Sequence, residues 1–294
     1  MKKILLLGAT GLLGSSLSPY LKKCGYQVID HGLQSKATIN ADLSHHIASF
    51  KVFTNIQPDV IINLAGLTSV DLCQERVDLA YLANIRIVEN ISNWIILTKS
   101  DSHFIQISTD HLYDGPIGMG GNKEDNIIIV NNYALTKYAA ELVAIRSPVT
   151  VLRTNFIGRS LIPSRETLTD WVYNNLKFGR EIKVLNDVYF SPLSIRRLIQ
   201  IIELVIKKKP IGVFNLGSSN GMTKADFDFA FAEALKLPTK TMKPIASADA
   251  TFLRAARPKN MCLNNGKIEK ALEIKLPNLI DLVQEVSEEY NEIT

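Results

Sequence analysis

Cysteine is scarce in this chain of 294 residues, which contains only Cys24, Cys73 and Cys262. The three lie far apart in sequence and form no Cys-x-x-Cys pair, so neither a disulfide framework nor a zinc ribbon is expected. Histidine is also rare, with five residues. The one adjacent pair, His45 and His46, would point in different directions from a helix. We therefore expect no metal site.

The chain also lacks a strong excess of one charge and a long apolar run. Its 33 Lys and Arg residues against 29 Asp and Glu residues give a net charge of +4, and the basic residues are scattered rather than gathered into a nucleic-acid-binding stripe. Gly8 and Gly11 interrupt the apolar N-terminus, which argues against a signal peptide, and no stretch is long enough to span a membrane. We expect a soluble cytoplasmic protein with no nucleic-acid or membrane partner.

Short apolar runs alternate with longer segments of helical apolar spacing in the first half of the chain. The runs typical of buried strands are Ile4–Leu7, Gln27–Ile29, Val60–Leu64, Phe104–Ile107 and Val149–Leu152. The segments typical of helices are Leu12–Leu21, Leu79–Leu97 and Tyr133–Ile145. This alternation predicts an α/β protein with a Rossmann-type doubly wound parallel sheet.

The pattern loosens after about Arg153. Here we expect helices over Thr167–Leu176 and Leu193–Ile206 and from Lys224 and Leu279 onward, with strands at Ile182–Leu185 and Val213–Leu216. We interpret residues 1–155 as a domain that binds NAD(P) and residues 156–294 as a smaller α/β substrate-binding domain, with part of 189–217 returning to the first. The glycine-rich loop Asp114–Asn132 is expected to be long and mobile.

The first predicted strand runs directly into the turn Gly8-Ala9-Thr10-Gly11-Leu12-Leu13-Gly14. Glycines at this spacing permit a tight turn, close approach of a pyrophosphate and close packing of the next helix on the strand. The N-terminus of that helix offers free N–H groups and the positive end of its dipole to phosphates. We predict that the turn binds NAD or NADP.

Tyr133 and Lys137 are four residues apart and share one face of a predicted helix. An unperturbed tyrosine has a pKa near ~10, and a nearby ammonium group favours its ionised form, as acid–base chemistry at neutral pH requires. Thr109 ends the fourth predicted strand, at the edge where open α/β sheets bind ligands, and its hydroxyl suits a hydrogen bond to a carbonyl oxygen. These three residues predict hydride transfer to a carbonyl carbon, with Tyr133 donating the proton.

The motifs resemble those of the extended short-chain dehydrogenases/reductases, whose glycine turn has this Gly-x-x-Gly-x-x-Gly spacing. The resemblance implies that Asp42 and Leu43 contact the adenine, that the cofactor lies against Ala65 and Gly66, and that Asn84 supports the proton relay. The implied cofactor-binding residues are Gly8, Thr10, Gly11, Leu12, Leu13, Asp42, Leu43, Ala65, Gly66, Asn84, Tyr133 and Lys137. Asp30 and Lys36 are candidates for distinguishing NAD from NADP, but neither decides the preference.

Within these enzymes the chain is similar to the dTDP-4-dehydrorhamnose reductases. Four stretches carry the resemblance, residues 65–71, 108–115, 151–156 and 257–263. It implies NAD(P)H-dependent reduction of the 4-keto group of a nucleotide-linked 6-deoxyhexose, with substrate contacts from Thr68, Asp110, Asn155, Phe156 and Arg257. Ala134 and Phe156 stand where this branch commonly has Gly and Trp, and Arg197 stands where an acid is common, so the exact sugar stays open.

Two other interpretations remain open. One is a related nucleotide-sugar epimerase or reductase. The other is a non-catalytic subunit, because the regulatory beta subunit of methionine adenosyltransferase resembles the same branch and binds a nicotinamide cofactor. The complete set of Thr109, Tyr133 and Lys137 favours an enzyme, and a homodimer is left open as its assembly.

Overall fold

The computed structural model describes residues 1–33, 37–118 and 120–291. The chain forms two compact units. Unit 1 consists of Met1–Thr109, Asn131–Arg153 and Ile199–Phe214, and unit 2 of Asp110–Val130, Thr154–Leu198 and Asn215–Thr294. Part of the stretch 189–217 thus belongs with the N-terminal strands, whereas the loop after Thr109 belongs with the later residues. The assignment of cofactor binding to residues 1–155 and of substrate binding to 156–294 stays a prediction.

The centre of unit 1 is a seven-stranded sheet with the order β11-β6-β5-β4-β1-β2-β3. Its strands are β1 (Lys3–Leu7), β2 (Gln27–Gly32), β3 (Ile39–Asn40), β4 (Val60–Asn63), β5 (His103–Thr109), β6 (Val149–Thr154) and β11 (Gly212–Leu216). Strand β1 pairs in parallel with both β2 and β4, and β4 pairs in parallel with β5. The chain therefore runs outward from β1 to β3 and then crosses back to β4, which creates a switch point between β1 and β4. The predicted α/β class with a Rossmann-type sheet is confirmed.

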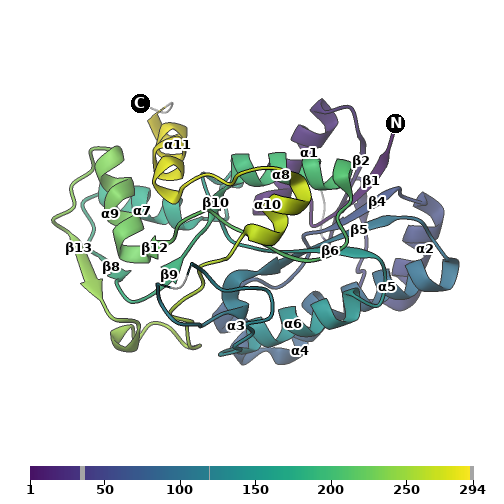
Figure 1. Cartoon of the computed structure of the whole chain (residues 1–294), viewed down its shortest axis with the longest axis horizontal. Coiled ribbons are helices and arrows are strands. Elements are labelled where there is room, and N and C mark those ends of the chain that lie inside the picture. Colours follow the sequence, from purple (N-terminus) through teal and green to yellow (C-terminus); the bar gives the residue numbers. More distant parts are fainter. Residues whose placement is uncertain (34–36, 119, 292–294) are drawn as a thin grey trace. The chain divides into compact units, whose positions relative to one another are not determined.

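Helices cover both faces of this sheet. They are α1 (Leu12–Lys23), α2 (His46–Ile56), α3 (Val70–Glu75), α4 (Val77–Ala80), the π-helical turn η1 (Tyr81–Arg86), α5 (Ile87–Thr98), α6 (Asn132–Ala144) and α8 (Ile195–Lys208). Figure 1 shows α1 and α8 on one face and α2, α5 and α6 on the other. Alternate strand residues such as Leu5 and Leu7 pack with Trp94 of α5 in one apolar core, as the period of two along a strand requires.

Unit 2 is built from short elements. They are the 3₁₀ turn η2 (Asp110–Leu112), β7 (Phe156–Ile157), α7 (Leu168–Lys177), β8 (Ile182–Leu185), β9 (Tyr189–Phe190), β10 (Leu193–Ser194), β12 (Met222–Thr223), α9 (Lys224–Ala234), β13 (Met242–Ile245), the 3₁₀ turn η3 (Ser247–Asp249), α10 (Gly266–Leu272) and α11 (Leu279–Asn291). Strand β7 pairs with β10, β9 with β12, and β8 with β13. Rings of Phe227 and Phe231 on α9 and of Tyr290 on α11 stack or meet edge to face, so aromatic packing joins these helices.

The predicted strands and helices are present with small shifts at their ends, except that the single helix predicted over Leu79–Leu97 is divided into α4, η1 and α5. Helix α8 begins at Ile195 rather than Leu193, because Leu193 and Ser194 form β10 beside β7. The apolar patterns did not predict α2, α3 or α10. Within the described ranges, no helix is both long and apolar enough to cross a membrane.

Candidate active site

The glycine turn after β1 requires glycine at two of its positions. Gly8 has a φ of 76°, and a Cβ there would lie 2.9 Å from the backbone nitrogen of Ala65. A Cβ on Gly14 would lie 2.4 Å from the carbonyl oxygen of Gly8. The backbone N–H of Gly11 donates to the same oxygen at 2.9 Å. The turn is therefore closed on itself and packed against the loop after β4, with no room for a side chain at Gly8 or Gly14.

The start of α1 leaves its backbone donors free of side-chain caps. Gly11 is the N-cap residue and offers no side-chain acceptor, and the first turn carries no acidic residue. Such a helix start suits a phosphate anion. Thr10 is exposed and Leu12 half-buried beside it, whereas Leu13 is buried in the core, so only the backbone of Leu13 is available to a ligand. The turn fits the pyrophosphate of a dinucleotide.

Asn84 fastens the loop after β4 to helix α6. Its Oδ1 accepts from the backbone N–H of Leu67 at 2.8 Å, and its Nδ2 donates to the Leu67 carbonyl at 3.2 Å and to Thr136 Oγ1 at 3.0 Å. A Cβ on Gly66 would lie 2.8 Å from Asn84 Oδ1, so the backbone beside Ala65 must stay bare. Asn84 lies in the π-helical turn η1, a distortion that often marks functional sites.

Other predicted contacts in unit 1 differ in exposure. Asp42 is exposed, and its Oδ1 accepts from the backbone N–H of Ser44 at 2.9 Å. Leu43 is buried, and its carbonyl accepts from Asn90 Nδ2 at 2.8 Å, so its side chain belongs to the core. Thr68 is exposed between β4 and α3.

Asp30 lies within β2, two residues before the end of the strand. Its carboxylate accepts from Ser18 Oγ at 2.6 Å and pairs with Lys22 Nζ at 2.5 Å. Side chains of helix α1 therefore already bind the carboxylate of Asp30, the candidate for distinguishing NAD from NADP. Lys36 lies outside the described residues, and the choice between NAD and NADP stays open.

Lys137 reaches from α6 to the end of β5. Its Nζ donates to the carbonyl of Ile107 at 2.7 Å, two residues before Thr109, which is itself buried. Burial lowers the pKa of Lys137 to about 8, although the charges of Glu141 and Cys73 act to raise it. The structure thus brings Lys137 to the strand end that carries Thr109.

Tyr133 lies one turn before Lys137 on α6 and is 8% exposed. Its ring packs with Cys73 and Ala80 from the α3 and α4 segment. The helix is capped just before it, because Asn131 Oδ1 accepts from the backbone N–H of Ala134 at 2.8 Å. The start of α6, and with it the place of the tyrosine, is fixed by this cap.

Glu141 is a buried charge that the sequence motifs did not reveal. Its Oε1 accepts from Ser108 Oγ at 2.5 Å, and its Oε2 pairs with Arg153 Nη2 at 2.6 Å. The spacing of Tyr133, Lys137 and Glu141, each four residues apart, was the signal that could have identified it.

Two of the predicted substrate contacts of unit 2, Asp110 and Asn155, are hydrogen-bonded to each other, and Asp110 is only 2% exposed. Its Oδ2 accepts from Asn155 Nδ2 at 2.8 Å, and Asn155 Oδ1 accepts from the backbone N–H of Phe156 at 2.8 Å. Phe156 is half-buried at the start of β7. Arg257 is also half-buried, and its Nη1 donates to the carbonyl of Ala255 at 2.7 Å.

Unit 2 also contains charged groups that the sequence analysis missed. Burial lowers the pKa of Lys224, the first residue of α9, while the charges of Asp110 and Asp228 raise it and that of Arg257 lowers it. Burial raises the pKa of Asp228 to about 8. It also lowers the pKa of His111 to about 3, with contributions from Lys224 and Arg257. The charge of Lys224 thus interacts with those of both Asp110 and Arg257, and two cations close to each other suit an anionic ligand.

The segment 257–263 anchors the glycine-rich loop. Asn260 Nδ2 donates to the carbonyls of Pro116 at 2.7 Å and Gly115 at 3.2 Å. Asn122 Nδ2 donates back to the carbonyls of Cys262 at 2.9 Å and Asn260 at 3.0 Å. This part of the motif has a structural role, which the sequence alone did not indicate.

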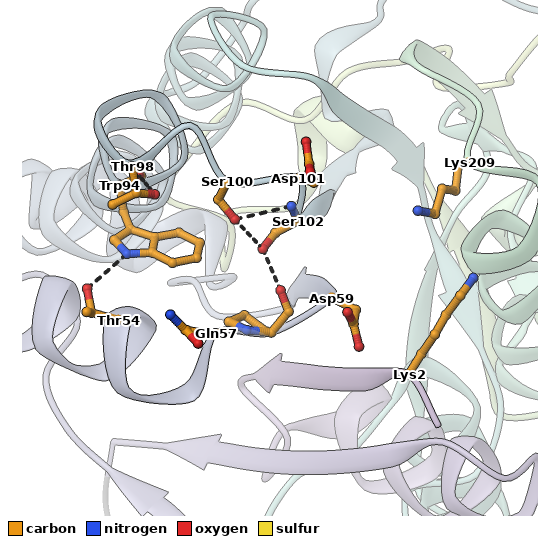
Figure 2. A pocket seen from close by; sticks show the side chains of 11 residues that line it. Lys2, Thr54, Gln57, Asp59, Trp94, Thr98, Ser100, Asp101, Ser102 and Lys209 are labelled. Atoms are coloured by element: carbon orange, nitrogen blue, oxygen red, sulfur yellow. Dashed lines mark hydrogen bonds between the residues drawn. The ribbon is translucent and has the colours of Figure 1, made fainter.

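A separate cavity of about 450 Å³ lies at the opposite edge of the sheet (Figure 2). Lys2, Asp59 and Ser102 line it and precede β1, β4 and β5, respectively. Trp94 Nε1 donates to Thr54 Oγ1 at 3.1 Å on another wall. Open α/β sheets bind ligands at the carboxyl ends of their strands. The glycine turn and the Ile107–Thr109 segment lie at those ends, so this cavity is not the candidate active site.

Comparison with known proteins identifies the family. A family model described as the RmlD substrate binding domain matches residues 1–292. The chain belongs to this family. The chain is similar to the dTDP-4-dehydrorhamnose reductase of Aggregatibacter actinomycetemcomitans, with 28% identity over 94% of this chain and 95% of the relative. The predicted resemblance is therefore confirmed.

Two further similarities bear on this RmlD-family chain. The methionine adenosyltransferase 2 subunit beta of Pongo abelii is 23% identical over 91% of this chain and 82% of the relative. The solved dTDP-4-dehydrorhamnose reductase of Bacillus anthracis str. Ames in complex with NADP is 21% identical, with a TM-score of 0.87 over 98% of this chain and 99% of that one. The structural similarity confirms the predicted fold.

Proposed function

We propose that this protein is an NADPH- or NADH-dependent reductase of the 4-keto group of a dTDP-linked 6-deoxyhexose. One observation carries the chemistry: Lys137, one turn after Tyr133 on α6, hydrogen-bonds the carbonyl of Ile107 at the end of β5, next to Ser108 and Thr109. The substrate class is supported by membership of the RmlD substrate binding domain family and by the dTDP-4-dehydrorhamnose reductase relative.

The cofactor would be held mainly by backbone. The bare turn at Gly8 and Gly14 and the uncapped start of α1 suit the pyrophosphate. The exposed backbone at Gly66 suits close approach of the rest of the dinucleotide. When bound, the reduced nicotinamide supplies the hydride.

The protein's own groups would manage the proton. Tyr133 donates its phenolic proton to the keto oxygen as negative charge develops there, and the hydroxyl of Thr109 hydrogen-bonds the same oxygen. Below pH about 8 Lys137 carries a positive charge, which stabilises the phenolate that Tyr133 becomes.

Unit 2 would bind the nucleotide sugar. Arg257 and Lys224 are the cations for its diphosphate, while the hydrogen-bonded pair of Asp110 and Asn155 would contact the sugar hydroxyls, with Phe156 along the ring. Thr68 of unit 1 is a further proposed sugar contact. Binding energy from the diphosphate and base would help to position the carbonyl.

A spectroscopic assay tests the proposal. Adding a dTDP-4-keto-6-deoxyhexose to the protein and NADPH or NADH should remove the absorbance of the reduced nicotinamide, whereas the free keto sugar should give little turnover. Analysis of the product at C4 and at the neighbouring carbons then separates a simple reductase from an epimerase. No turnover with any nucleotide-linked 4-keto sugar, despite normal cofactor binding, would contradict the proposal.

The second candidate is a cofactor-binding regulatory subunit, which the similarity to the methionine adenosyltransferase 2 subunit beta favours. A catalytically silent protein that binds NADP and forms a stable complex with a larger enzyme would support it. The presence of Tyr133, Lys137 and Thr109 supports the reductase instead.

A nicotinamide-dependent activity of this kind is proposed to operate in the cytoplasm, and a homodimer stays a prediction.

A further inference from the structure

Two neighbouring residues of β5 are fastened to α6 by two different side chains. The carbonyl of Ile107 accepts from Lys137 Nζ at 2.7 Å, and the hydroxyl of Ser108 donates to Glu141 Oε1 at 2.5 Å. The next residue is Thr109. The strand end that carries the proposed carbonyl contact is thus tied to the helix at both preceding positions.

Glu141 is itself held from a third element. Arg153 on β6 donates from Nε to both carboxylate oxygens, at 3.0 and 3.1 Å, and from Nη2 to Oε2 at 2.6 Å. The side chains are only 4% and 2% exposed for Arg153 and Glu141, respectively. A planar guanidinium that engages both oxygens fixes the orientation of the carboxylate as well as its place. Glu141 therefore presents a rigid acceptor to Ser108.

The geometry of α6 links this acceptor to the proposed chemistry. Residues four apart on a helix form one stripe, so Tyr133, Lys137 and Glu141 all face the same way from α6. Sliding α6 along β5 would move all three together relative to Thr109. A misplacement of about 1 Å between reacting groups can reduce a rate by ~10²-fold.

We infer that Glu141 is a positioning residue: clamped by Arg153, it holds Ser108 and so sets where Thr109 meets Tyr133 and Lys137. The identity of the reacting groups rests on the proposed function, but the clamp itself rests on the contacts alone. Glu141 is not placed in contact with substrate or cofactor. It acts through the alignment of α6 with β5.

A matched pair of serines separates alignment from general stability. Ser108 and Ser147 are each 5% exposed in unit 1, but the hydroxyl of Ser147 donates to the Ala144 carbonyl near the end of its own helix α6, at 3.0 Å. Ser108→Ala leaves the Glu141–Arg153 pair intact and removes its tie to β5. We expect Ser108→Ala to lower kcat about tenfold or more, because the alignment of α6 with β5 is lost. The KM for the nucleotide-linked keto sugar should stay within about twofold of wild type, because substrate binding is left intact.

Ser147→Ala should keep kcat within about twofold, as expected for a change away from the site. Thermal unfolding of both variants shows whether their stabilities are comparable. Equal kcat values in Ser108→Ala and Ser147→Ala would overturn the inference. If the wild type itself has no turnover, the proposed function fails. The inference about Glu141 is then tested by the cofactor dissociation constants of the two serine variants, measured by fluorescence. Weaker binding in Ser108→Ala than in Ser147→Ala then sustains the clamp, since Lys137 is displaced, and equal binding overturns it.

A double-mutant cycle tests the route through Glu141. Glu141→Gln preserves the shape of the side chain but removes the charge that Arg153 grips. If Ser108 acts through Glu141, Ser108→Ala should cost little more in the Glu141→Gln background, because the two residues form one unit. Fully additive losses in kcat would contradict this route. If Glu141→Gln does not fold, the serine pair still decides.

Discussion

The two units assemble their predicted sites in different ways. In unit 1, one turn of a few residues after β1 provides the dinucleotide cradle through backbone alone, and one helix face carries Tyr133 and Lys137. In unit 2, Asp110, Asn155 and Arg257 come from separate segments: Asp110 is hydrogen-bonded to Asn155, and the charges of Asp110 and Arg257 both act on Lys224. The contrast indicates that cofactor chemistry depends on local pattern and geometry, whereas substrate recognition depends on charges gathered from distant parts of the chain.

Tyr133→Phe should give the largest effect and should distinguish the proposed chemistry of unit 1 from the substrate binding proposed for unit 2. Loss of one hydroxyl should reduce kcat by ~10²–10⁴-fold, the contribution typical of a general acid, while the dissociation constants of cofactor and nucleotide sugar stay near wild type. Tyr138→Phe, on the same helix, is the matched control and should retain activity. Steady-state kinetics with fluorescence titration of the cofactor checks both, and near-normal turnover in Tyr133→Phe would assign the proton to another group.

Arg257→Ala in unit 2 should have the opposite kinetic effect to Tyr133→Phe, weakening substrate binding rather than slowing the chemical step. A lost hydrogen bond to a charged group costs about 1.5–3 kcal/mol, so we expect the KM of the nucleotide sugar to rise about 10- to 150-fold with kcat changed far less. Lys270→Ala removes an equal charge from an exposed position on α10 and should leave KM unchanged. A fall in kcat at constant KM would instead link Arg257 to the chemistry.

The glycine turn can be tested with two glycines of similar backbone conformation. Gly8 and Gly25 have φ angles of 76° and 87°, but only at Gly8 would a Cβ meet other atoms. Both alanine variants should lose about 1–2 kcal/mol of stability from the left-handed backbone, and Gly8→Ala should lose more, because its Cβ would also meet the backbone of Ala65. Only Gly8→Ala should also weaken cofactor binding, by about tenfold or more, because the cradle must deform. Equal cofactor affinity in the two variants, measured by fluorescence, would remove the turn from the binding site.

The smallest expected effect is the pH dependence of Lys137. Its pKa of about 8 lies below the ordinary 10.5 because burial disfavours the charged form. Activity should therefore fall as the pH rises through about 8, when the ammonium loses its proton. The sign for stability is opposite: burying the charged amine costs stability below about pH 8, and this cost is relieved as the pH rises toward 10.5. A rate profile flat to about pH 10 would show that the Lys137 charge does not contribute.

Apolar periodicity was sufficient to predict the sheet and most helices, because the core side chains of β1 and α5 repeat at the spacing that each element buries. The glycine turn was equally predictable, since the glycine spacing that it requires lies within one short segment. Glu141 and Lys224 were missed because their environments depend on Arg153 and Asp110, respectively, which are distant from them in the sequence. These are contacts that only tertiary structure creates.

Asp30 is a residue that the sequence did suggest for the site but whose contacts sequence patterns could not predict. Its place in the sequence made it a candidate for distinguishing NAD from NADP without deciding the preference. The hydrogen bond from Ser18 and the ion pair with Lys22 engage its carboxylate within the structure. Neither partner belongs to a recognised cofactor motif, so spacing alone could not have revealed this arrangement.

The most direct test of the account is the oxidation of NADPH or NADH by the wild-type protein in the presence of a dTDP-4-keto-6-deoxyhexose. The account predicts loss of the reduced-nicotinamide absorbance with the nucleotide-linked sugar, little with the free sugar, and almost none with Tyr133→Phe. Cofactor binding without turnover on any nucleotide-linked 4-keto sugar would contradict it. Undiminished turnover in Tyr133→Phe would contradict the proposed proton donor.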